Sequence, residues 1–363
     1  PRGRELSGGA ADLTTLAAAQ TGDEAAFVRL TAPHRDRLHR HCYRMLGSLY
    51  DADDAHQELM LRAWRGLGGY RPEGPFGAWL TRIATNVCLR IIETRRRIPQ
   101  PSPDAHLEPY PDALLGPDPP TDPLQQVSER EQVGLAMIAA MQLLPPRQRV
   151  AVLLRDVLGY TATETASQLG VTVAAANSAL QRGRERLDRE ARECTLGAKH
   201  RPTSGAVERA DMDRFQRAWA EMDFPALLAL LSDDALLTMP PEDARFHGAQ
   251  AIGRFFATIP LEGRLDRIRL VPTRTNGQPA LAAYADEETP GVHDAYGLMV
   301  FSVQGDRIRA ITGFPRRPDL FQRLGLPVTL PPAQPNRPAL PTPPDPTHAQ
   351  APSSPGEPPP SKT

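Results

Sequence analysis

The sequence predicts a multidomain protein with two all-α modules, the second a helix-turn-helix, followed by an α+β domain and a disordered Pro-rich tail. Three observations predict this organisation. The chain has 363 residues, which is more than one ordinary hydrophobic core contains. Its 39 prolines are about twice the usual share and they cluster. The apolar spacing is helical on either side of a Pro-rich stretch at 98–125, and strand-like segments appear only after residue 205.

Composition divides the chain into six segments. In chain order we expect a flexible N-terminus, a first helical module, a Pro-rich acidic linker, a second helical module, an α+β domain and a disordered tail: residues 1–11, 12–97, 98–125, 126–201, 205–324 and 325–363. The linker has five acidic residues and no basic one, and its prolines exclude a helix. We therefore expect it to be extended.

The composition also excludes several classes of protein. No apolar run is long enough to cross a membrane, so we expect a cytoplasmic protein without membrane contact. The three cysteines are far apart and form no C-x-x-C motif, which excludes a disulfide framework and the familiar zinc sites. We expect no cofactor and no metal, and we expect any nucleic acid to bind the two helical modules, which are mildly basic.

The first module is expected to contain several amphipathic helices. Asp12 and Asp23 are candidate N-caps. A helix expected over 53–66 directs Leu59, Ala63 and Trp64 to the core, while its polar face carries Asp54, Gln57, Glu58 and Arg62. A Gly- and Pro-containing loop over 68–77 leads to another helix over 78–97.

The most informative local pattern lies in the second module. Thr161 can cap a short helix together with Glu164, Gly170 permits a tight turn, and Thr172 can cap a second helix. This spacing predicts a helix-turn-helix. On the second helix, the inward residues are expected to be Val173, Ala176 and Leu180.

The outward face of this second helix carries small or polar side chains that can approach base edges in a major groove, namely Ala174, Asn177, Ser178 and Gln181. Three basic side chains, Arg182, Arg184 and Arg186, can add phosphate contacts. An alternative is a helical hairpin that has a solvated Arg-rich end and binds no DNA.

The α+β domain is expected from a change in residue pattern. Two helices are expected over 207–222 and 225–231. The segments rich in β-branched and aromatic residues, expected to be strands, are 265–274, 279–285, 292–303 and 307–314. Gly277, Gly291 and Gly305 lie at the turns between them.

Five sequence segments together resemble the extracytoplasmic-function (ECF) sigma factors, which are non-catalytic subunits that bring RNA polymerase to promoters. They are HCYRMLGS at 41–48, DDAHQELMLRAW at 53–64, WLTRIATNVCL at 79–89 followed by three arginines, LPPRQR at 144–149, and the helix-turn-helix. His56, Arg90 and Ala176 depart from the usual pattern, which weakens single contacts and not the resemblance.

The resemblance implies partners and roles for these residues. It implies that Asp54, Gln57, Glu58 and Arg62 dock on the clamp coiled coil of the largest subunit of core RNA polymerase. It implies minus 35 promoter DNA binding by the second helix of the helix-turn-helix. The linker is expected to thread toward the polymerase active-site channel, where its carboxylates mimic nucleic acid.

The resemblance also implies that the loop at 68–77 and the helix after it open the minus 10 element of the promoter. A flipped base needs an aromatic wall and hydrogen-bond donors, which Phe76, Trp79 and Asn86 can supply. The basic residues of this region, which are expected to contact DNA, are Arg82, Arg95, Arg96 and Arg97. Core packing is an equally good interpretation of Trp79.

The C-terminal domain resembles the SnoaL-like cone fold. The residues that carry this resemblance are Phe215, Trp219, Leu227, Leu228, Leu231, Asp234, Met239, Pro240, Pro241, Gly248, Phe255 and Phe256. Sigma factors with this addition are self-regulated, which implies that the domain contacts both DNA-binding regions. A cone filled with apolar side chains is expected, so the protein is not expected to be an enzyme.

Two alternatives to a self-regulated sigma factor remain open. One is a SnoaL-type enzyme with a vestigial sigma half, whose acid–base candidates are His247, Tyr284, His293, Asp294 and Tyr296. The other is a helix-turn-helix repressor that binds DNA without polymerase. Whether a small ligand occupies the cone, and whether the domain activates or inhibits, also stay open.

Overall fold

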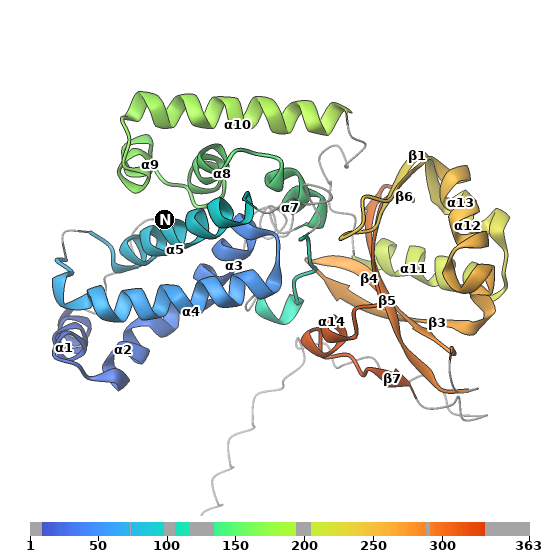
Figure 1. Cartoon of the computed structure of the whole chain (residues 1–363), viewed down its shortest axis with the longest axis horizontal. Helices are drawn as coiled ribbons and strands as arrows, with labels where there is room; N and C mark the ends of the chain where they lie inside the picture. Colours follow the sequence, from blue (N-terminus) through green and yellow to red (C-terminus); the bar gives the residue numbers. More distant parts are fainter. Residues whose placement is uncertain are drawn as a thin grey trace, which may run out of the picture.

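A computed structural model describes residues 9–72, 74–97, 106–115, 134–193, 205–287 and 291–330. Two groups of helices lie against each other, and a domain built on a curved sheet lies at one end of them (Figure 1). The helices of the first group are α1 (Gly9–Gln20), α2 (Glu24–Thr31), α3 (Arg35–Leu46), α4 (Leu49–Gly66) and α5 (Phe76–Arg95).

Local capping explains the ends of the first helices. The Asp23 side chain accepts a hydrogen bond from the Ala26 N–H at 2.9 Å, which confirms it as the N-cap of α2. The expectation for Asp12 is wrong, because α1 already begins at Gly9 and Asp12 lies inside it. Residues 9–11 of the expected flexible N-terminus are therefore helical, and residues 1–8 lie outside the described residues.

The second group contains α7 (Leu135–Gln142), α8 (Pro146–Val152), α9 (Ala162–Leu169) and α10 (Val173–Glu193). A π-helical turn over Leu153–Val157 continues α8. Gly183 lies where α10 crosses α8, and a Cβ there would approach the Val152 Cγ2 to 2.8 Å. Glycine at this position therefore lets the two helices pack closely.

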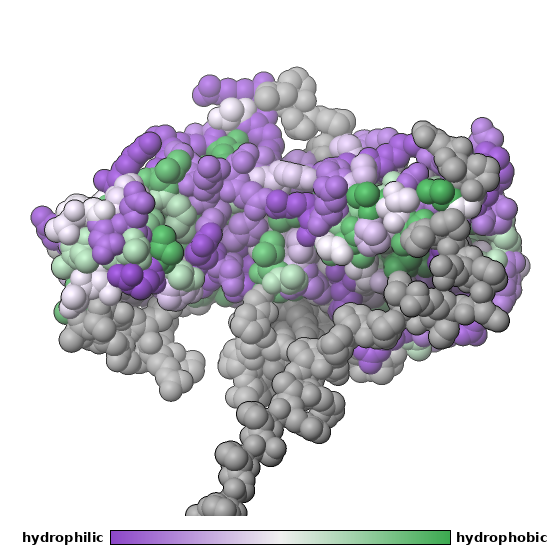
Figure 2. Space-filling view, turned by 90° about the horizontal axis from the view of Figure 1, so that it is seen from below, coloured by the Kyte–Doolittle hydropathy of each residue, from purple (hydrophilic) through white to green (hydrophobic). Residues whose placement is uncertain are grey.

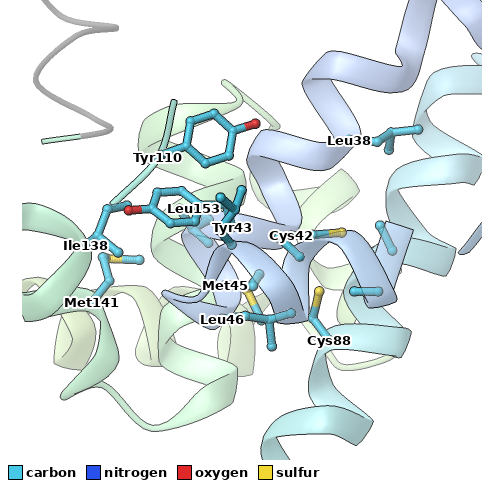
Figure 3. Close-up of a cluster of buried hydrophobic side chains, with 14 of the residues drawn as sticks. Leu38, Cys42, Tyr43, Met45, Leu46, Cys88, Tyr110, Ile138, Met141 and Leu153 are labelled. Carbon is cyan, nitrogen blue, oxygen red and sulfur yellow. The ribbon is translucent and has the colours of Figure 1, made fainter. Parts of the chain in front are cut away.

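The two helical groups share one hydrophobic core. Side chains of α3 and α5 pack against α7 and α8 in a single cluster of buried residues (Figure 3). Its fully buried members include Tyr43 and Met45 on α3, Ile138 on α7 and Leu154 on the π-helical turn. The two predicted helical modules are therefore present, and in this conformation their apolar faces cover each other.

The linker is more ordered than the proline pattern predicts. Leu107 and Tyr110 are buried in the shared core, and Asp112–Leu114 forms a short 3-10 turn. Pro111 forms a β-bridge with Thr275 of the C-terminal domain. Residues 106–115 therefore contain no α-helix but pack against the rest of the protein, while 98–105 and 116–125 lie outside the described residues.

The C-terminal domain is an α+β cone, as expected. Its helices are α11 (Gly205–Ala220), α12 (Phe224–Leu230), α13 (Ala249–Thr258) and α14 (Pro318–Arg323). Its strands are β1 (Leu231–Thr238), β2 (Arg245–His247), β3 (Ile268–Thr275), β4 (Gln278–Ala285), β5 (His293–Gln304), β6 (Arg307–Pro315) and β7 (Thr329–Leu330). The strand order is β2-β1-β6-β5-β4-β3, with β7 beside β5.

The end of this domain lies beyond the expected boundary. Strand β7 pairs with β5 through Thr329 and Leu330, so residues 325–330 belong to the sheet rather than to a disordered tail. Residues 331–363 of the expected tail lie outside the described residues. The sequence patterns did not predict β1, β2, α13 or α14.

Both faces of the sheet are covered. The concave face encloses an apolar cluster with Phe215 and Trp219 of α11, Phe256 of α13, and Phe301 of β5. The opposite face, including Tyr284 and Phe314, belongs to the same buried cluster as the helical modules. Every residue of β4 is buried for this reason.

The face of the molecule seen from below is mainly polar where it is coloured (Figure 2). Seen from below, hydrophilic and hydrophobic residues are interspersed over the part of the surface that is coloured (Figure 2). In the described part of the chain, no helix combines the length and the apolar character that crossing a membrane requires.

One buried arginine joins the two helical modules. Arg149 on α8 donates hydrogen bonds to the Met45 carbonyl on α3 and to the carbonyls of Gln142 and Leu144, the last two at 2.8 and 3.3 Å. It also donates to the Gln142 Oε1 at 2.6 Å. Arg149 is only 4% exposed, so these acceptors replace the water that it lacks.

We predict that Arg149→Met lowers the free energy of unfolding by about 1–3 kcal/mol, because buried carbonyl oxygens lose their donor. The matched control is Arg147→Met, two residues away on an exposed part of α8, for which the change should stay within about 0.5 kcal/mol. Denaturant titration of the full chain measures both. Equal stability of the two variants would contradict the prediction.

Candidate functional site

The polar face of α4 is accessible. Asp54 and Gln57 are exposed, and the Arg62 Nε donates to the Glu58 Oε1 at 2.6 Å, one helical turn away. Leu59 and Ala63 are buried, as the spacing predicts. Leu61 is 44% exposed and adds an apolar side chain to this polar surface. The structure therefore brings the four predicted residues together on one surface.

An aromatic cluster lies at the start of α5. The Phe76 and Trp79 rings are 5.4 Å apart between centroids, and both lie near Tyr70, at 5.4 and 5.0 Å. Phe76 and Trp79 are half-buried. Tyr70 was missed in the sequence, although an aromatic residue within the Gly-rich loop was a usable signal. Its hydroxyl donates to the Gly74 carbonyl at 2.8 Å, which closes the loop, while its ring contacts α5.

The polar residues expected beside this cluster differ in their surroundings. Arg82, Asn86, Arg96 and Arg97 are exposed. Arg95 instead turns inward, where it forms an ion pair with Asp51 and donates to the Leu46 carbonyl at 3.1 Å. Its guanidinium therefore stabilises the contact between α3, α4 and α5 in this conformation.

The helix-turn-helix forms as predicted. Thr161 and Glu164 make a reciprocal capping box, Gly170 has a φ of 63°, and the Ala175 N–H donates to the Thr172 Oγ1 at 3.2 Å. Ala176 and Leu180 are buried. Val173 was expected to point inward, which is wrong, because it lies in the first turn of α10 and is 40% exposed.

The outward face of α10 is not covered by any of the residues that the structure describes. Its exposed residues are Ala174, Asn177, Ser178, Gln181, Arg182, Arg184 and Arg186. Two of them have intramolecular partners, because Arg184 pairs with Asp156 at 3.0 Å and Gln181 donates to Glu185 at 3.0 Å. The hydrogen bond that Arg184 donates to the Asp156 carboxylate raises the pKa of Arg184 above its ordinary value.

The helix-turn-helix and the aromatic cluster are in direct contact. The Gln168 Nε2 on α9 donates to the Ala78 carbonyl on α5 at 3.0 Å, beside Trp79. Together with the Arg149 contacts, this bond holds α5 and α10 in one body. The two surfaces predicted to bind DNA therefore cannot move apart in this conformation.

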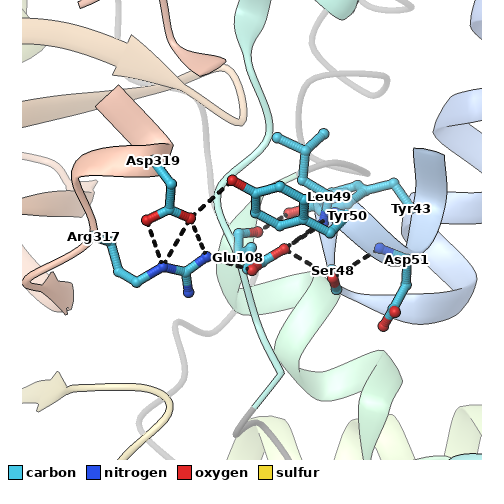
Figure 4. A network of polar contacts seen from close by, with 8 residues as sticks. All are labelled: Tyr43, Ser48, Leu49, Tyr50, Asp51, Glu108, Arg317 and Asp319. Carbon is cyan, nitrogen blue, oxygen red and sulfur yellow. Dashed lines mark hydrogen bonds and ion pairs between the residues drawn. The ribbon is translucent and has the colours of Figure 1, made fainter. Parts of the chain in front are cut away.

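Glu108 of the linker connects three parts of the protein (Figure 4). Its Oε2 accepts hydrogen bonds at the start of α4 from the Ser48 hydroxyl at 2.8 Å, the Leu49 N–H at 2.9 Å and the Tyr50 N–H at 3.2 Å. Its Oε1 accepts a bond from Arg317 of the C-terminal domain at 2.7 Å. Glu108 is 7% exposed, so each of its oxygens is satisfied by protein.

Helix α14 lies against the first turns of α4. Asp319 accepts bonds from Arg317 at 3.0 Å and from the Tyr50 hydroxyl at 2.8 Å. Arg323 forms an ion pair with Asp53 and lies 5.4 Å from the Tyr50 ring centroid. The Arg317 guanidinium lowers the pKa of Asp319, which keeps this carboxylate charged.

The tip of the β3–β4 hairpin holds the linker from the other side. The Thr275 hydroxyl donates to the Tyr110 carbonyl at 2.6 Å, and the Tyr110 N–H donates to the Asn276 Oδ1 at 2.8 Å. The Gln278 Oε1 also accepts from the Leu135 N–H at 2.7 Å, at the start of α7. The hairpin thus contacts both the linker and the second helical module.

The five acid–base candidates of the C-terminal domain do not converge. Tyr284 faces away from the cone interior and donates to the Pro327 carbonyl at 2.9 Å. Asp294 accepts from Thr329 on β7 at 2.6 Å, and Tyr296 lies under the Arg316 guanidinium. His247 is exposed on β2 and His293 is half-buried at the start of β5.

Comparison with known proteins identifies the class. The family model described as Sigma-70 region 2 matches residues 30–98, and that described as Sigma-70, region 4 matches residues 134–187. The ECF RNA polymerase sigma factor SigG of Mycobacterium tuberculosis is 38% identical over 320 residues, which cover 83% of this chain and 84% of SigG. The chain therefore belongs to the ECF RNA polymerase sigma factors.

A second relative and one solved structure are also similar to this chain. SigM of M. tuberculosis is 37% identical over 178 residues, covering 49% of this chain and 83% of SigM. The crystal structure of the M. tuberculosis sigma factor SigJ is similar in fold, with a TM-score of 0.55 and 22% identity over 83% of this chain and 99% of SigJ. The protein thus acts as a sigma factor that binds core RNA polymerase and promoter DNA.

Three histidines in the first module are held neutral by their surroundings. Burial is the larger cause and the nearby Arg44 cation a smaller one, and together they lower the pKa of His41 to about 3. Burial, and to a smaller extent the Arg323 cation, lower the pKa of His39 to about 4. They do so although the His39 Nε2 lies only 2.8 Å from the Asp53 carboxylate, whose negative charge favours the protonated form. The Asp53 carboxylate is shared with Arg323, which limits its effect on His39. Burial, and to a smaller extent the neighbouring His39, lower the pKa of His56 to about 4.

We predict that the stability of the protein falls as the pH drops. Histidine in an unfolded chain takes up a proton at about pH 6.5, whereas these three do so only near pH 4 or below in the folded protein. Between those values the unfolded chain binds more protons, so the free energy of unfolding decreases from about pH 6.5 downward.

Denaturant titrations at several pH values measure this slope. His56→Gln should make it shallower, because one of the three groups no longer titrates, whereas His247→Gln, at an exposed position, should leave it unchanged. A slope that is identical in all three proteins would refute the assignment of His56.

Proposed function

We propose that the exposed face of α4 docks on the clamp coiled coil of the polymerase. The proposal is supported by the joint exposure of Asp54 and Gln57 and by the neighbouring Glu58–Arg62 pair. A charged rim around the half-exposed Leu61 has the mixed character of protein interfaces.

The start of α5 opens the minus 10 element in this proposal. Phe76 and Trp79 form the aromatic wall, with Tyr70 behind them, and the exposed Asn86 offers a donor to an extruded base. Arg82, Arg96 and Arg97 contact phosphates. Arg95 joins them only if its ion pair with Asp51 breaks.

The α10 helix reads the minus 35 element in this proposal. Ala174, Asn177, Ser178 and Gln181 face the bases, and Arg182 and Arg186 contact the backbone. Arg184 also contacts the DNA backbone once its ion pair with Asp156 is replaced by one with a phosphate. Because α5 and α10 are held in one body, binding at both promoter elements requires the modules to separate.

The observation that carries the regulatory proposal is the set of contacts around Glu108. They tie the linker to α4 and to the C-terminal domain, so this conformation keeps the linker out of the polymerase channel. We infer that the structure is a closed state and that the C-terminal domain stabilises it. Binding to polymerase then requires release of Arg317 and of the hairpin tip.

We further propose that the C-terminal domain regulates without catalysing a reaction and that the protein works in the cytoplasm with its polymerase. The support is that the acid–base candidates lie in different places, while Leu281, Met299 and Phe301 fill the concave face. The proposal assigns no small ligand to the cone.

We predict that Asp54→Lys weakens binding to core polymerase at least about tenfold and lowers transcription in vitro accordingly, because a cation replaces an anion at the interface. Asp213→Lys makes the same charge change on an exposed position of α11 and should leave both unchanged. Fluorescence anisotropy with labelled protein and run-off transcription provide the measurements. Equal behaviour of the two variants would remove the support for α4 as the docking helix.

We predict that Arg317→Ala opens the protein. Removing this cation leaves the buried Glu108 charge without its ion pair, which shifts the closed-to-open equilibrium about tenfold or more. The matched control is Arg316→Ala, which changes the neighbouring arginine that pairs with Glu287 inside the domain. Small-angle scattering should show a larger radius, and transcription should rise, for Arg317→Ala alone. No difference between the variants would refute the role of Arg317.

A further inference from the structure

The tip of the β3–β4 hairpin contains a chemically labile pair. Of the four asparagines in the chain, Asn276 alone precedes a glycine. Asn276 and Gly277 have φ values of 57° and 68°, as a tight hairpin turn with two left-handed residues requires. Asn276 is also 0% exposed, which is unusual for a hairpin tip.

The side chain of Asn276 is fully engaged by the rest of the protein. Its Oδ1 accepts the Tyr110 N–H, and its Nδ2 donates to the Tyr43 hydroxyl oxygen, both at 2.8 Å. The Gly277 N–H donates to the Asp112 Oδ1, also at 2.8 Å. These three partners belong to the linker and to α3, so the tip is protected only while the domains are closed.

An Asn-Gly pair can react without an enzyme. The backbone nitrogen of Gly277 attacks the side-chain carbon Cγ of Asn276, a C–N bond forms, the Cγ–Nδ2 bond breaks, and ammonia leaves. Water then opens the cyclic imide at either carbonyl and yields aspartate or isoaspartate. The net reaction consumes one water and releases one ammonia, with no oxidant or reductant.

We propose that Asn276 is a spontaneous deamidation site whose reactivity is controlled by opening of the protein, and that its product prevents reclosure. The inference rests on the closed and open states of the proposed function. The closed structure hinders the reaction, because the amide of Asn276 is held by two hydrogen bonds, the attacking nitrogen is held by Asp112, and Asn276 itself is 0% exposed to water.

The product does not fit the closed site. The Tyr43 hydroxyl already donates its single proton to the Glu108 carbonyl at 2.9 Å, so towards residue 276 it presents only an acceptor. The amide Nδ2 of Asn276 satisfies that acceptor, whereas a carboxylate oxygen would face it without a proton. Asp112 adds a second negative charge nearby.

Isoaspartate disturbs the site further. It lengthens the backbone by one atom at the turn, where Thr275 and Gln278 pair in register. Both of these residues hold other parts of the protein, because Thr275 bonds to the linker and Gln278 bonds to α7. Deamidation would therefore convert a transiently opened molecule into one that stays open.

The first test follows the reaction itself. The purified full chain is incubated at mildly alkaline pH, alongside Arg317→Ala and Arg316→Ala, and peptide mass mapping with enzymatic isoaspartate methylation measures the product at residue 276. Asn177, which precedes Ser178 on the exposed face of α10, serves as an internal reference. We expect deamidation at Asn276 to be at least about tenfold faster in Arg317→Ala, in proportion to its open fraction, and unchanged at Asn177.

Equal rates at Asn276 in the three proteins would overturn the inference if scattering shows that Arg317→Ala is open. If scattering shows that Arg317→Ala stays closed, the proposed function fails and the inference is still tested with wild-type protein opened by guanidinium. If deamidation at Asn276 is no faster in that opened protein than in the closed one, the inference is overturned as well. The two failures are therefore distinguishable.

The second test examines the consequence for the domains. Asn276→Asp carries the reaction product, and Asn276→Gln keeps the amide. We expect Asn276→Asp to raise the ratio of open to closed molecules by about tenfold to a hundredfold, because the closed state would bury a polar group without a hydrogen-bond partner. Transcription should rise as it does for Arg317→Ala. Asn276→Gln should open less. An Asn276→Asp protein as compact and as inactive as the parent would overturn the proposed block on reclosure.

Discussion

The buried carboxylate of Glu108 is the interaction on which the closed structure depends. The first backbone N–H groups of a helix have no intrahelical partner, and a negative charge near them is stabilised by the helix dipole. Glu108 supplies this charge to α4 from a distant part of the chain, and Arg317 balances it from a third part. Loss of any one of the three partners leaves the others buried and unsatisfied.

This arrangement couples surfaces that lie far apart in the sequence. The face of α4 that we propose to bind polymerase begins one turn after Tyr50, which contacts Asp319 and Arg323 of the C-terminal domain. Arg149 and Gln168 hold the second helical group, which includes α10, against α3 and α5. A partner that binds only the open form therefore favours the loss of all of these contacts together. This shared closed-to-open equilibrium is the condition for coupling between separate sites.

The elements that sequence patterns predicted are those whose cause is local. The capping box of Thr161 and Glu164, the left-handed Gly170 and the buried Ala176 follow from neighbouring residues. Strand β1 was missed because the exposed Asp233 and Asp234 interrupt its apolar pattern, and α14 was missed because it has only six residues. Both are stabilised by packing against distant parts of the chain.

The sequence by itself determined the two helical modules, the surfaces of α4 and α10, and the resemblance to sigma factors, because periodicity and capping depend on residues a few positions apart. Only the tertiary structure decided that the linker is packed, that Arg95 turns inward, and that Asn276 is buried. Their partners lie tens to hundreds of residues away, for example Asn276 with Tyr43. No local pattern encodes such a contact, because it exists only once the domains have closed on one another.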